Sequence, residues 1–176
     1  MAQSAIDIFN RASQLQATGN FGEALRILQI AADNGYAPAL QRLGDTFSYA
    51  IGVEQNFTKA FEFYYRAACT GLAISQYKVG WSFQFGVGVP RDYNKAIEFY
   101  FLAADQEYPL AQFCLAWCYE HGVGVEKNPQ KAKEYFEKSA QGGMDEALYR
   151  VGENCEIDEY SAQTGPYNVI QPLEIE

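Results

Sequence analysis

The sequence predicts an all-α fold, a right-handed superhelical α-solenoid of antiparallel helix pairs with about nine helices. The first observation is a repeat of 36 residues that keeps its register without insertions. A Gly-Val step stands at 52–53, 88–89 and 124–125, and a Lys-Ala step follows seven residues after each. A period of this length indicates stacked units that bury their apolar faces against one another. The second observation is that apolar residues within each unit recur three and four positions apart, as on one helical face.

Residues 73–108 show how a unit is built. Val79 and Phe83 lie four residues apart and define the first helix. Two glycines and a proline interrupt the pattern between residues 85 and 90, because glycine permits backbone angles closed to other residues and proline blocks a continuing helix. Asp92 is a good N-cap for the second helix. Units 37–72 and 109–144 share this plan, with Asn56 and Asn128 in the place of Asp92.

The two ends of the chain depart from this plan. Residues 1–36 predict two helices, near 4–18 and 21–34, joined by a short turn that lacks the Gly-x-Gly-Val loop. Residues 145–157 start a further unit that has no second helix, and we interpret them as a capping helix, which ends the single domain at residue 157. Residues 158–176 form an acidic and apolar tail, whose glycine and prolines exclude a regular helix.

Composition and charge exclude several classes of function. The chain has 176 residues and a net charge of −9, of which residues 153–176 supply six negative charges and no Lys or Arg. The rest of the chain lacks a basic stripe, so nucleic acid is not an expected partner. We find neither a signal peptide nor an apolar run of membrane-spanning length. We therefore expect a cytoplasmic protein without membrane insertion, and export by a route that needs no signal stays open.

The repeat resembles a known family. Residues 111–143 carry its motif most completely, at Ala111, Leu115, Tyr119, Gly122, Gly124, Val125, Lys131, Ala132 and Ala140. This pattern is similar to the Sel-one-like repeat (SLR) family, a relative of the tetratricopeptide repeats, and the turn of residues 1–36 resembles the tetratricopeptide type. The resemblance implies a protein–protein interaction module, adaptor or regulatory scaffold. It also leaves open a secretion-system effector or immunity protein.

The variable positions of the first helices suggest where a peptide or protein partner binds. Both tryptophans of the chain, Trp81 and Trp117, occupy the same repeat position. Aromatic side chains dominate many binding hot spots. We therefore expect a concave aromatic groove, with packing between helices as the alternative role of these side chains. The predicted contact residues are Tyr77, Trp81, Phe85, Phe113, Trp117, His121, Tyr149 and Glu153. Acidic residues beside them, Asp45 and Glu120 among others, would favour basic flanking residues in the partner.

Other chemistry is not favoured. Cys114, Cys118 and His121 fall at i, i+4 and i+7, but the position of Cys114 carries Arg42 and Lys78 in other units, which indicates an exposed site. Since no CxxC pair or fourth ligand accompanies them, we predict no metal and no cofactor. Catalytic residues do not form a recognisable set, so we do not expect an enzyme such as a hydrolase. A second possibility is self-association through residues 158–176, which would dock in a groove of the same or a neighbouring molecule.

Overall fold

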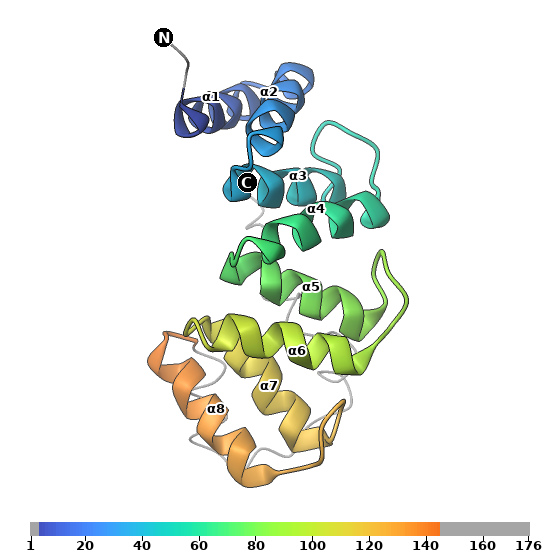
Figure 1. Cartoon of the computed structure of the whole chain (residues 1–176), viewed down its shortest axis with the longest axis vertical. Coiled ribbons are helices and arrows are strands. Elements are labelled where there is room, and N and C mark those ends of the chain that lie inside the picture. The colour runs from blue at the N-terminus through green and yellow to red at the C-terminus, as the bar shows by residue number, and fades with distance from the viewer. Residues whose placement is uncertain (1–3, 145–176) are drawn as a thin grey trace, which may run out of the picture.

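The computed structural model describes residues 4–144, and this part of the chain is all-α (Figure 1). Eight helices follow one another as four antiparallel pairs, which confirms the predicted solenoid. The expected ninth helix at 145–157 and the tail at 158–176 lie outside the described residues. The helices are α1 (Ala5–Ala17), α2 (Phe21–Asp33), α3 (Ala37–Ser48), α4 (Phe57–Cys69), α5 (Ala73–Phe85), α6 (Tyr93–Ala104), α7 (Pro109–His121) and α8 (Pro129–Gln141).

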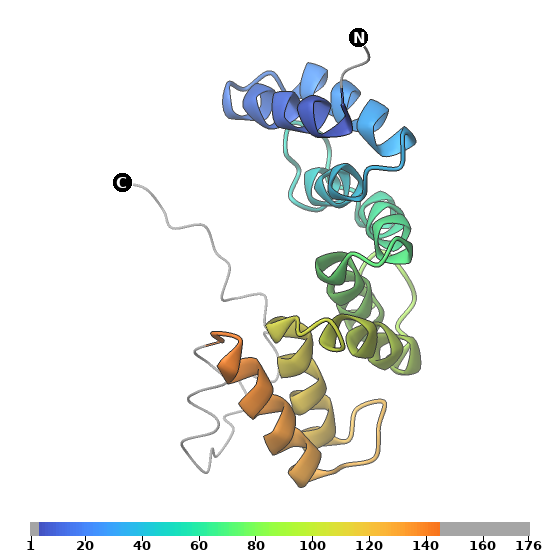
Figure 2. The ribbon, with the colours of Figure 1, turned by 60° about the vertical axis from the view of Figure 1, so that its left-hand side comes forward.

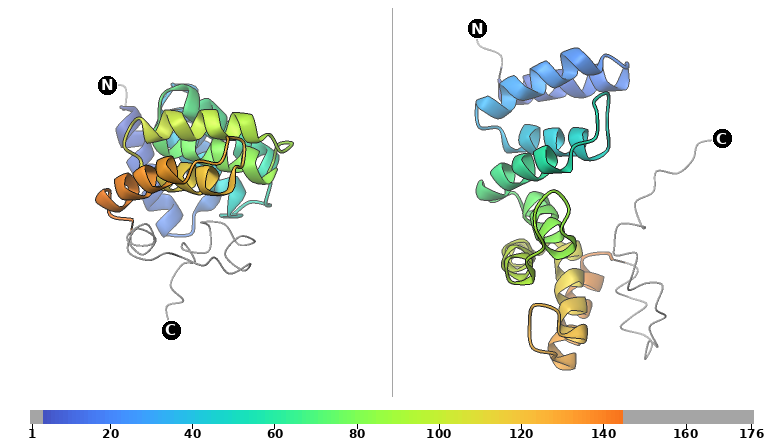
Figure 3. Two further views of the ribbon diagram at one scale, coloured as in Figure 1. Left: turned by 90° about the horizontal axis from the view of Figure 1, so that it is seen from below. Right: turned by 90° about the vertical axis from the view of Figure 1, so that its right-hand side faces the viewer.

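The pairs stack along one axis. Each helix packs mainly on the helix before it and the helix after it in the chain. Figure 1 shows the stack running from α1 at one end to α8 at the other, with the three long loops along one edge. Figures 2 and 3 show that the described array is elongated and that successive pairs are rotated relative to one another. A chain arranged in this way offers long side surfaces rather than one central cavity.

The second helices of the three long-loop units begin in the same way. The side-chain oxygens of Asn56, Asp92 and Asn128 accept hydrogen bonds from the backbone N–H of Lys59, Lys95 and Lys131, three residues further on. These are the predicted N-caps, and each satisfies one of the open N–H groups at a helix start. The lysines recur for a second reason. Each ammonium lies over an aromatic ring of the first helix, at 5.3 Å from Phe47, 5.3 Å from Phe83 and 5.1 Å from Tyr119 respectively.

The first helix of each of these units ends in a left-handed residue. Gly86 and Gly122 adopt φ of 71° and 75° just after α5 and α7. Glycine takes this conformation without steric cost. In the unit of α3, the equivalent residue is Ala50, which also has a positive φ, of 56°. The geometry of the loop is therefore kept even where the favoured residue is missing.

A small residue in each first helix allows close approach of the second helix. A Cβ atom on Gly80 would lie 2.7 Å from the ring of Tyr100, which is fully buried. Ala116 holds the same position in α7 and is 0% exposed beside the helix that carries Phe136. Close packing of this kind explains why a small residue recurs in the first helix together with an aromatic residue in the second helix.

Candidate partner-binding surface

The structure buries two of the residues that the sequence suggested as partner contacts. Tyr77 and Phe113 are each 4% exposed. The ring of Tyr77 lies 5.5 Å from that of Tyr108, and the ring of Phe113 lies 5.4 Å from that of Phe136. These two side chains therefore pack between helices, which is the alternative role that the sequence left open. Helical periodicity could not separate the two roles, since α5 and α7 carry buried residues on nearly every face.

Four other predicted contact residues form two equivalent pairs near the C-terminal ends of α5 and α7. The rings of Trp81 and Phe85 are 5.0 Å apart and tilted by 41°. The rings of Trp117 and His121 are 4.4 Å apart and stacked, with 23° between their planes. Phe85 is 39% exposed, while the other three are half-buried. The repeat therefore places an i, i+4 ring pair on two successive first helices.

His121 is held in one orientation. Its Nδ1 lies 2.8 Å from the carbonyl oxygen of Trp117. Because a carbonyl oxygen only accepts, Nδ1 is the donor in this contact. The same nitrogen lies 3.7 Å from Oε2 of Glu120. The hydrogen bond and the stacked ring contact thus fix the imidazole against the indole and reduce the conformational entropy that is lost when a partner binds.

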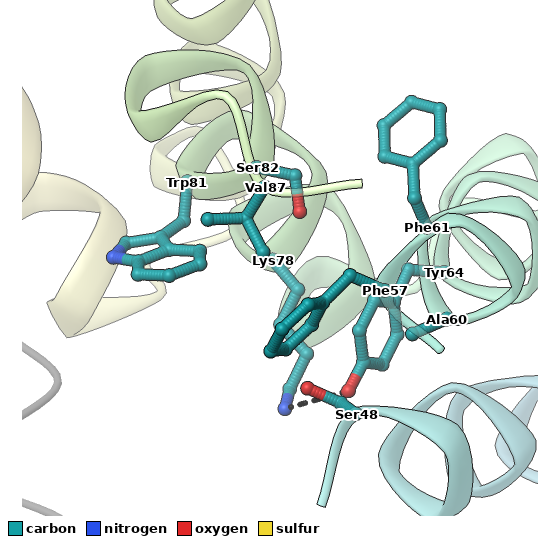
Figure 4. A pocket seen from close by; sticks show the side chains of 9 residues that line it. All are labelled: Ser48, Phe57, Ala60, Phe61, Tyr64, Lys78, Trp81, Ser82 and Val87. Carbon is teal, nitrogen blue, oxygen red and sulfur yellow. Dashed lines mark hydrogen bonds between the residues drawn. The ribbon is translucent and has the colours of Figure 1, made fainter. Parts of the chain in front are cut away.

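A small cleft adjoins the first of these pairs. It lies between α3, α4, α5 and the loop after α5 and has a volume of about 10 Å³, roughly the space that one water molecule needs. In Figure 4 the ammonium of Lys78 points to the hydroxyl of Tyr64, and Trp81 and Phe61 stand at opposite sides. Trp81 belongs to both the ring pair and the cleft. The cleft is lined by Ser48, Phe57, Ala60, Phe61, Tyr64, Lys78, Trp81, Ser82 and Val87.

Two residues of the cleft, Tyr64 and Lys78, belong to a polar network that the sequence did not predict. Asp45 Oδ1 accepts from the hydroxyl of Tyr64 at 2.7 Å and from Nζ of Lys78 at 2.8 Å. Its other oxygen accepts from the side-chain amide of Gln41. Asp45 therefore has its hydrogen-bonding capacity occupied inside the protein, and the expectation that it selects basic partner residues does not hold in this structure. The signal available in the sequence was that Asp45 and Lys78 both replace apolar residues of the next unit, Trp81 and Cys114.

Both cysteines of α7 are buried. Cys114 is 4% exposed, so the expectation of an exposed site is wrong. Arg42 and Lys78 stand in the equivalent positions, and their longer side chains reach solvent or a partner from a position that buries a cysteine. Cys118 is 1% exposed, and burial raises the pKa of its thiol to about 12. Within residues 4–144, no three His, Cys, Asp or Glu side chains come together in a way that could hold a metal ion. Tyr149 and Glu153 lie outside the described residues.

Comparison with known families places this architecture. The Sel1 repeat model matches four successive segments, at residues 5–36, 37–72, 73–108 and 109–144. The chain belongs to the Sel1 repeat family. The first match includes the pair at the N-terminus, although its turn lacks the long glycine loop. Sel1 repeat proteins generally mediate protein–protein interactions, and they are typically scaffolds rather than enzymes.

Solved structures with Sel1 repeats share this fold. A protective antigen of uropathogenic Escherichia coli with an SLR fold is 27% identical, with a TM-score of 0.78 over 85% of this chain and 33% of the antigen. A Sel1 repeat protein from Oxalobacter formigenes is 25% identical, with a TM-score of 0.76 over 83% of this chain and 58% of that protein. This chain thus spans less than two thirds of either relative.

A third structure resembles the chain in fold alone. It is an immunity protein of Pseudomonas aeruginosa, 21% identical, with a TM-score of 0.58 over 86% of this chain and 58% of that protein. No curated protein matched the sequence. Among the described helices, none combines the length and apolar character needed to cross a membrane.

Proposed function

We propose that this protein is a non-enzymatic interaction module, an adaptor or scaffold that holds a peptide or protein segment on the ring pairs of α5 and α7. We call this surface the aromatic surface and define it by Trp81, Phe85, Trp117 and His121. The observation that carries the proposal is the repetition of the pair. Two successive units place a tryptophan and a second ring one helical turn apart, at the same repeat position.

Physical chemistry supports the choice of this surface. Tryptophan and tyrosine provide large contact areas with few rotatable bonds, and they are enriched among residues that dominate binding energy. The rings here are already ordered by their mutual contacts and by the bond from His121 to the Trp117 carbonyl. Because Asp45 is paired with Lys78, recognition in this region rests on apolar contact more than on charge.

The partner that fits is an extended or helical segment with apolar side chains. Such a segment can lie across neighbouring first helices, because a solenoid presents equivalent positions at regular intervals. The rim of the cleft beside Trp81, with Phe57 and Val87, adds apolar contact surface for the partner, but the cleft itself is too small to admit a side chain.

Peptide selection followed by calorimetry tests the proposal. Peptides are selected from a random display library on the full chain, and the affinity of the best binder is measured by isothermal titration. We expect Phe85→Ala and Trp117→Ala to weaken binding at least about tenfold, or about 1.4 kcal/mol each. Tyr65→Ala is the matched control, since Tyr65 is 43% exposed on the second helix α4. An equal loss with Tyr65→Ala, or full affinity in both test variants, contradicts the proposal.

Unfolding must be separated from loss of binding. Trp117 packs partly against the main apolar cluster, so its removal also affects packing. Phe85 is more exposed and carries less of this effect. Each variant is therefore compared with the wild type in a urea titration, and affinities are interpreted for variants whose unfolding midpoint is retained. Loss of affinity in Phe85→Ala with an unchanged midpoint supports the aromatic surface.

A further inference from the structure

A second hollow lies away from the aromatic surface, at the opposite ends of the helices. It has a volume of about 530 Å³ and lies between the last turn of α6, the start of α7 and the C-terminal half of α8. We call it the turn cleft. Figure 1 shows the end of α8 beside the connection between α6 and α7. The lining residues that matter here are Asp105, Glu107, Gln112, Tyr135, Lys138 and Gly142.

The preceding unit, residues 73–108, satisfies the equivalent glutamine from within the chain. Gln76 donates from Nε2 to the carbonyl oxygen of Ala68 at 3.4 Å, and its Oε1 accepts from Nε2 of Gln106 at 2.7 Å. Both hydrogen-bonding functions of this buried amide are therefore used. Gln106 supplies its donor from the turn that follows α6.

In the next unit the donor is missing. Gln112, the repeat equivalent of Gln76, again donates to a backbone carbonyl, that of Ala104, at 3.4 Å. The equivalent of Gln106 is Gly142, which has no side chain. Pro109 enforces this change, because a Cβ atom on Gly142 would lie 2.5 Å from Cγ of Pro109. The preceding unit has the smaller Ala73 where Pro109 stands.

The consequence is an acceptor without a donor. Gln112 is 5% exposed, and its Oε1 has no hydrogen-bond partner within residues 4–144. A buried polar atom left in this state is destabilising, so a ligand that supplies the missing donor gains affinity from it. Gln112 lines the turn cleft, but its Oε1 is itself buried, so a donor from outside reaches this oxygen once the side-chain amide has turned toward the cleft.

The charges around Gln112 indicate the kind of donor. Asp105 and Glu107 contribute two carboxylates to the lining, against one ammonium from Lys138. The Lys138 ammonium lies 5.1 Å from the centre of the Tyr135 ring, where a cation–π contact holds it. A cationic donor therefore meets a net negative lining. A guanidinium also has several N–H groups in one plane and can donate to an amide oxygen and a carboxylate together.

We propose that the turn cleft binds the guanidinium of an arginine side chain from a protein partner, with Gln112 Oε1 and an acidic residue of the lining as acceptors. This site goes beyond the proposed function, because it lies apart from the aromatic surface and selects a different side chain. A partner that spans both surfaces would combine an apolar segment with an arginine outside it. The two contacts would then reinforce each other through their effective concentration.

Two variants drawn from the chain's own repeats test the site. Gln112→Leu copies Leu40, which is buried at 3% exposure in the equivalent position and so is compatible with the fold. Pro109→Ala/Gly142→Gln copies Ala73 and Gln106 and supplies the donor from within the chain. The probe is N-acetyl-L-argininamide at low salt, and the neutral control is N-acetyl-L-citrullinamide. Binding is followed by NMR through the backbone amide signals around residue 142.

We expect the arginine derivative to cause saturable changes in the amide chemical shifts of the wild type. The citrulline derivative should bind at least about tenfold more weakly. Both variants should also weaken binding at least about tenfold. Trp81→Ala should bind the probe like the wild type, which separates this site from the aromatic surface. Shifts that fail to saturate in the wild type, or equal binding by Pro109→Ala/Gly142→Gln, would overturn the proposal.

Discussion

The ammonium of Lys78 lies 2.8 Å from Oδ1 of Asp45 and joins two successive repeats. Their side chains are only 12% and 17% exposed, so salt screens this pair less than an exposed one. The next interface along the solenoid has Trp81 and Cys114 in the two equivalent positions. The same two repeat positions thus carry an ion pair between the second and third pairs of helices and apolar residues between the third and fourth.

Loss of the Lys78 ammonium should destabilise the protein. Replacing Lys78 with Met leaves the Asp45 carboxylate largely buried, with Tyr64 and Gln41 as its remaining donors. We expect the free energy of unfolding to fall by about 1–3 kcal/mol in urea titrations. A double-mutant cycle with Asp45→Asn gives the coupling between the two residues.

An exposed ion pair provides the control for this measurement. On α8, Nζ of Lys133 lies 4.0 Å from Oε1 of Glu137, and the two side chains are 64% and 45% exposed. Lys133→Met should cost less than about 0.5 kcal/mol. A loss for Lys78→Met that is no larger than this would show that the pair does not hold the repeats together.

Ala50→Gly should stabilise the protein. Ala50 has a φ of 56°, a conformation that costs a residue with a Cβ atom about 1 kcal/mol, and the side chain is exposed. Removal of the Cβ atom should therefore raise the free energy of unfolding by about 1 kcal/mol and the melting temperature by about 2–4 °C. Calorimetry measures both.

The reverse change at Gly86 is the matched control. Gly86 occupies the same repeat position with a φ of 71°, and a Cβ atom there would meet its nearest neighbour at an ordinary 3.5 Å. Gly86→Ala should therefore destabilise by about 1 kcal/mol through backbone conformation alone. If both substitutions shift stability in the same direction, the left-handed conformation is not what decides the preference for glycine.

Stability should decline at high pH, in part because of Cys118. Burial raises the pKa of this thiol from 9.0 to about 12. Between these values the unfolded chain loses a proton that the folded chain keeps, so unfolding becomes more favourable as pH rises. The contribution is fully present below pH 9 and is lost by about 1.4 kcal/mol per pH unit above it. Urea titrations from pH 8 to 11 give this slope.

Cys118→Ser isolates the contribution of the thiol. Thr46 and Ser82 occupy the same repeat position, and the Thr46 hydroxyl donates to the carbonyl oxygen four residues earlier at 2.8 Å. Serine at position 118 can do the same, so we expect the fold to be kept. The pKa of Tyr100 is raised mainly by burial and in smaller part by neighbouring groups that include Cys118, so the difference between the two slopes includes a small contribution from this coupling. Identical slopes in the two proteins would contradict the burial of the thiol.

The sequence predicted the scaffold closely because the repeat carries the information several times. The helices expected near 4–18 and 21–34 are α1 at Ala5–Ala17 and α2 at Phe21–Asp33. The N-caps followed from residue type alone, as at Asp92. Caps, left-handed residues and small helix contacts are local requirements, and each unit meets them separately.

The site was less predictable because it depends on contacts between units. A helix in the middle of a solenoid is covered from several sides, so Tyr77 looks like a surface residue by position and is nevertheless buried. Asp45 and Lys78 are 33 residues apart and meet only after two units have stacked. The orphaned acceptor of Gln112 likewise depends on two other positions, Pro109 and Gly142. These departures are visible when the units are aligned, but their consequences appear only in the folded structure.

Tryptophan fluorescence tests the central claim most directly, because the chain contains only two tryptophans. In Trp117→Phe the emission reports on Trp81, and in Trp81→Phe it reports on Trp117. Each variant is titrated with the display-selected peptide while calorimetry records binding. If the partner lies across both ring pairs, the emission of each variant changes and saturates at the peptide concentration that calorimetry gives. Calorimetric binding with unchanged emission in both variants would place the partner elsewhere and contradict the proposed function.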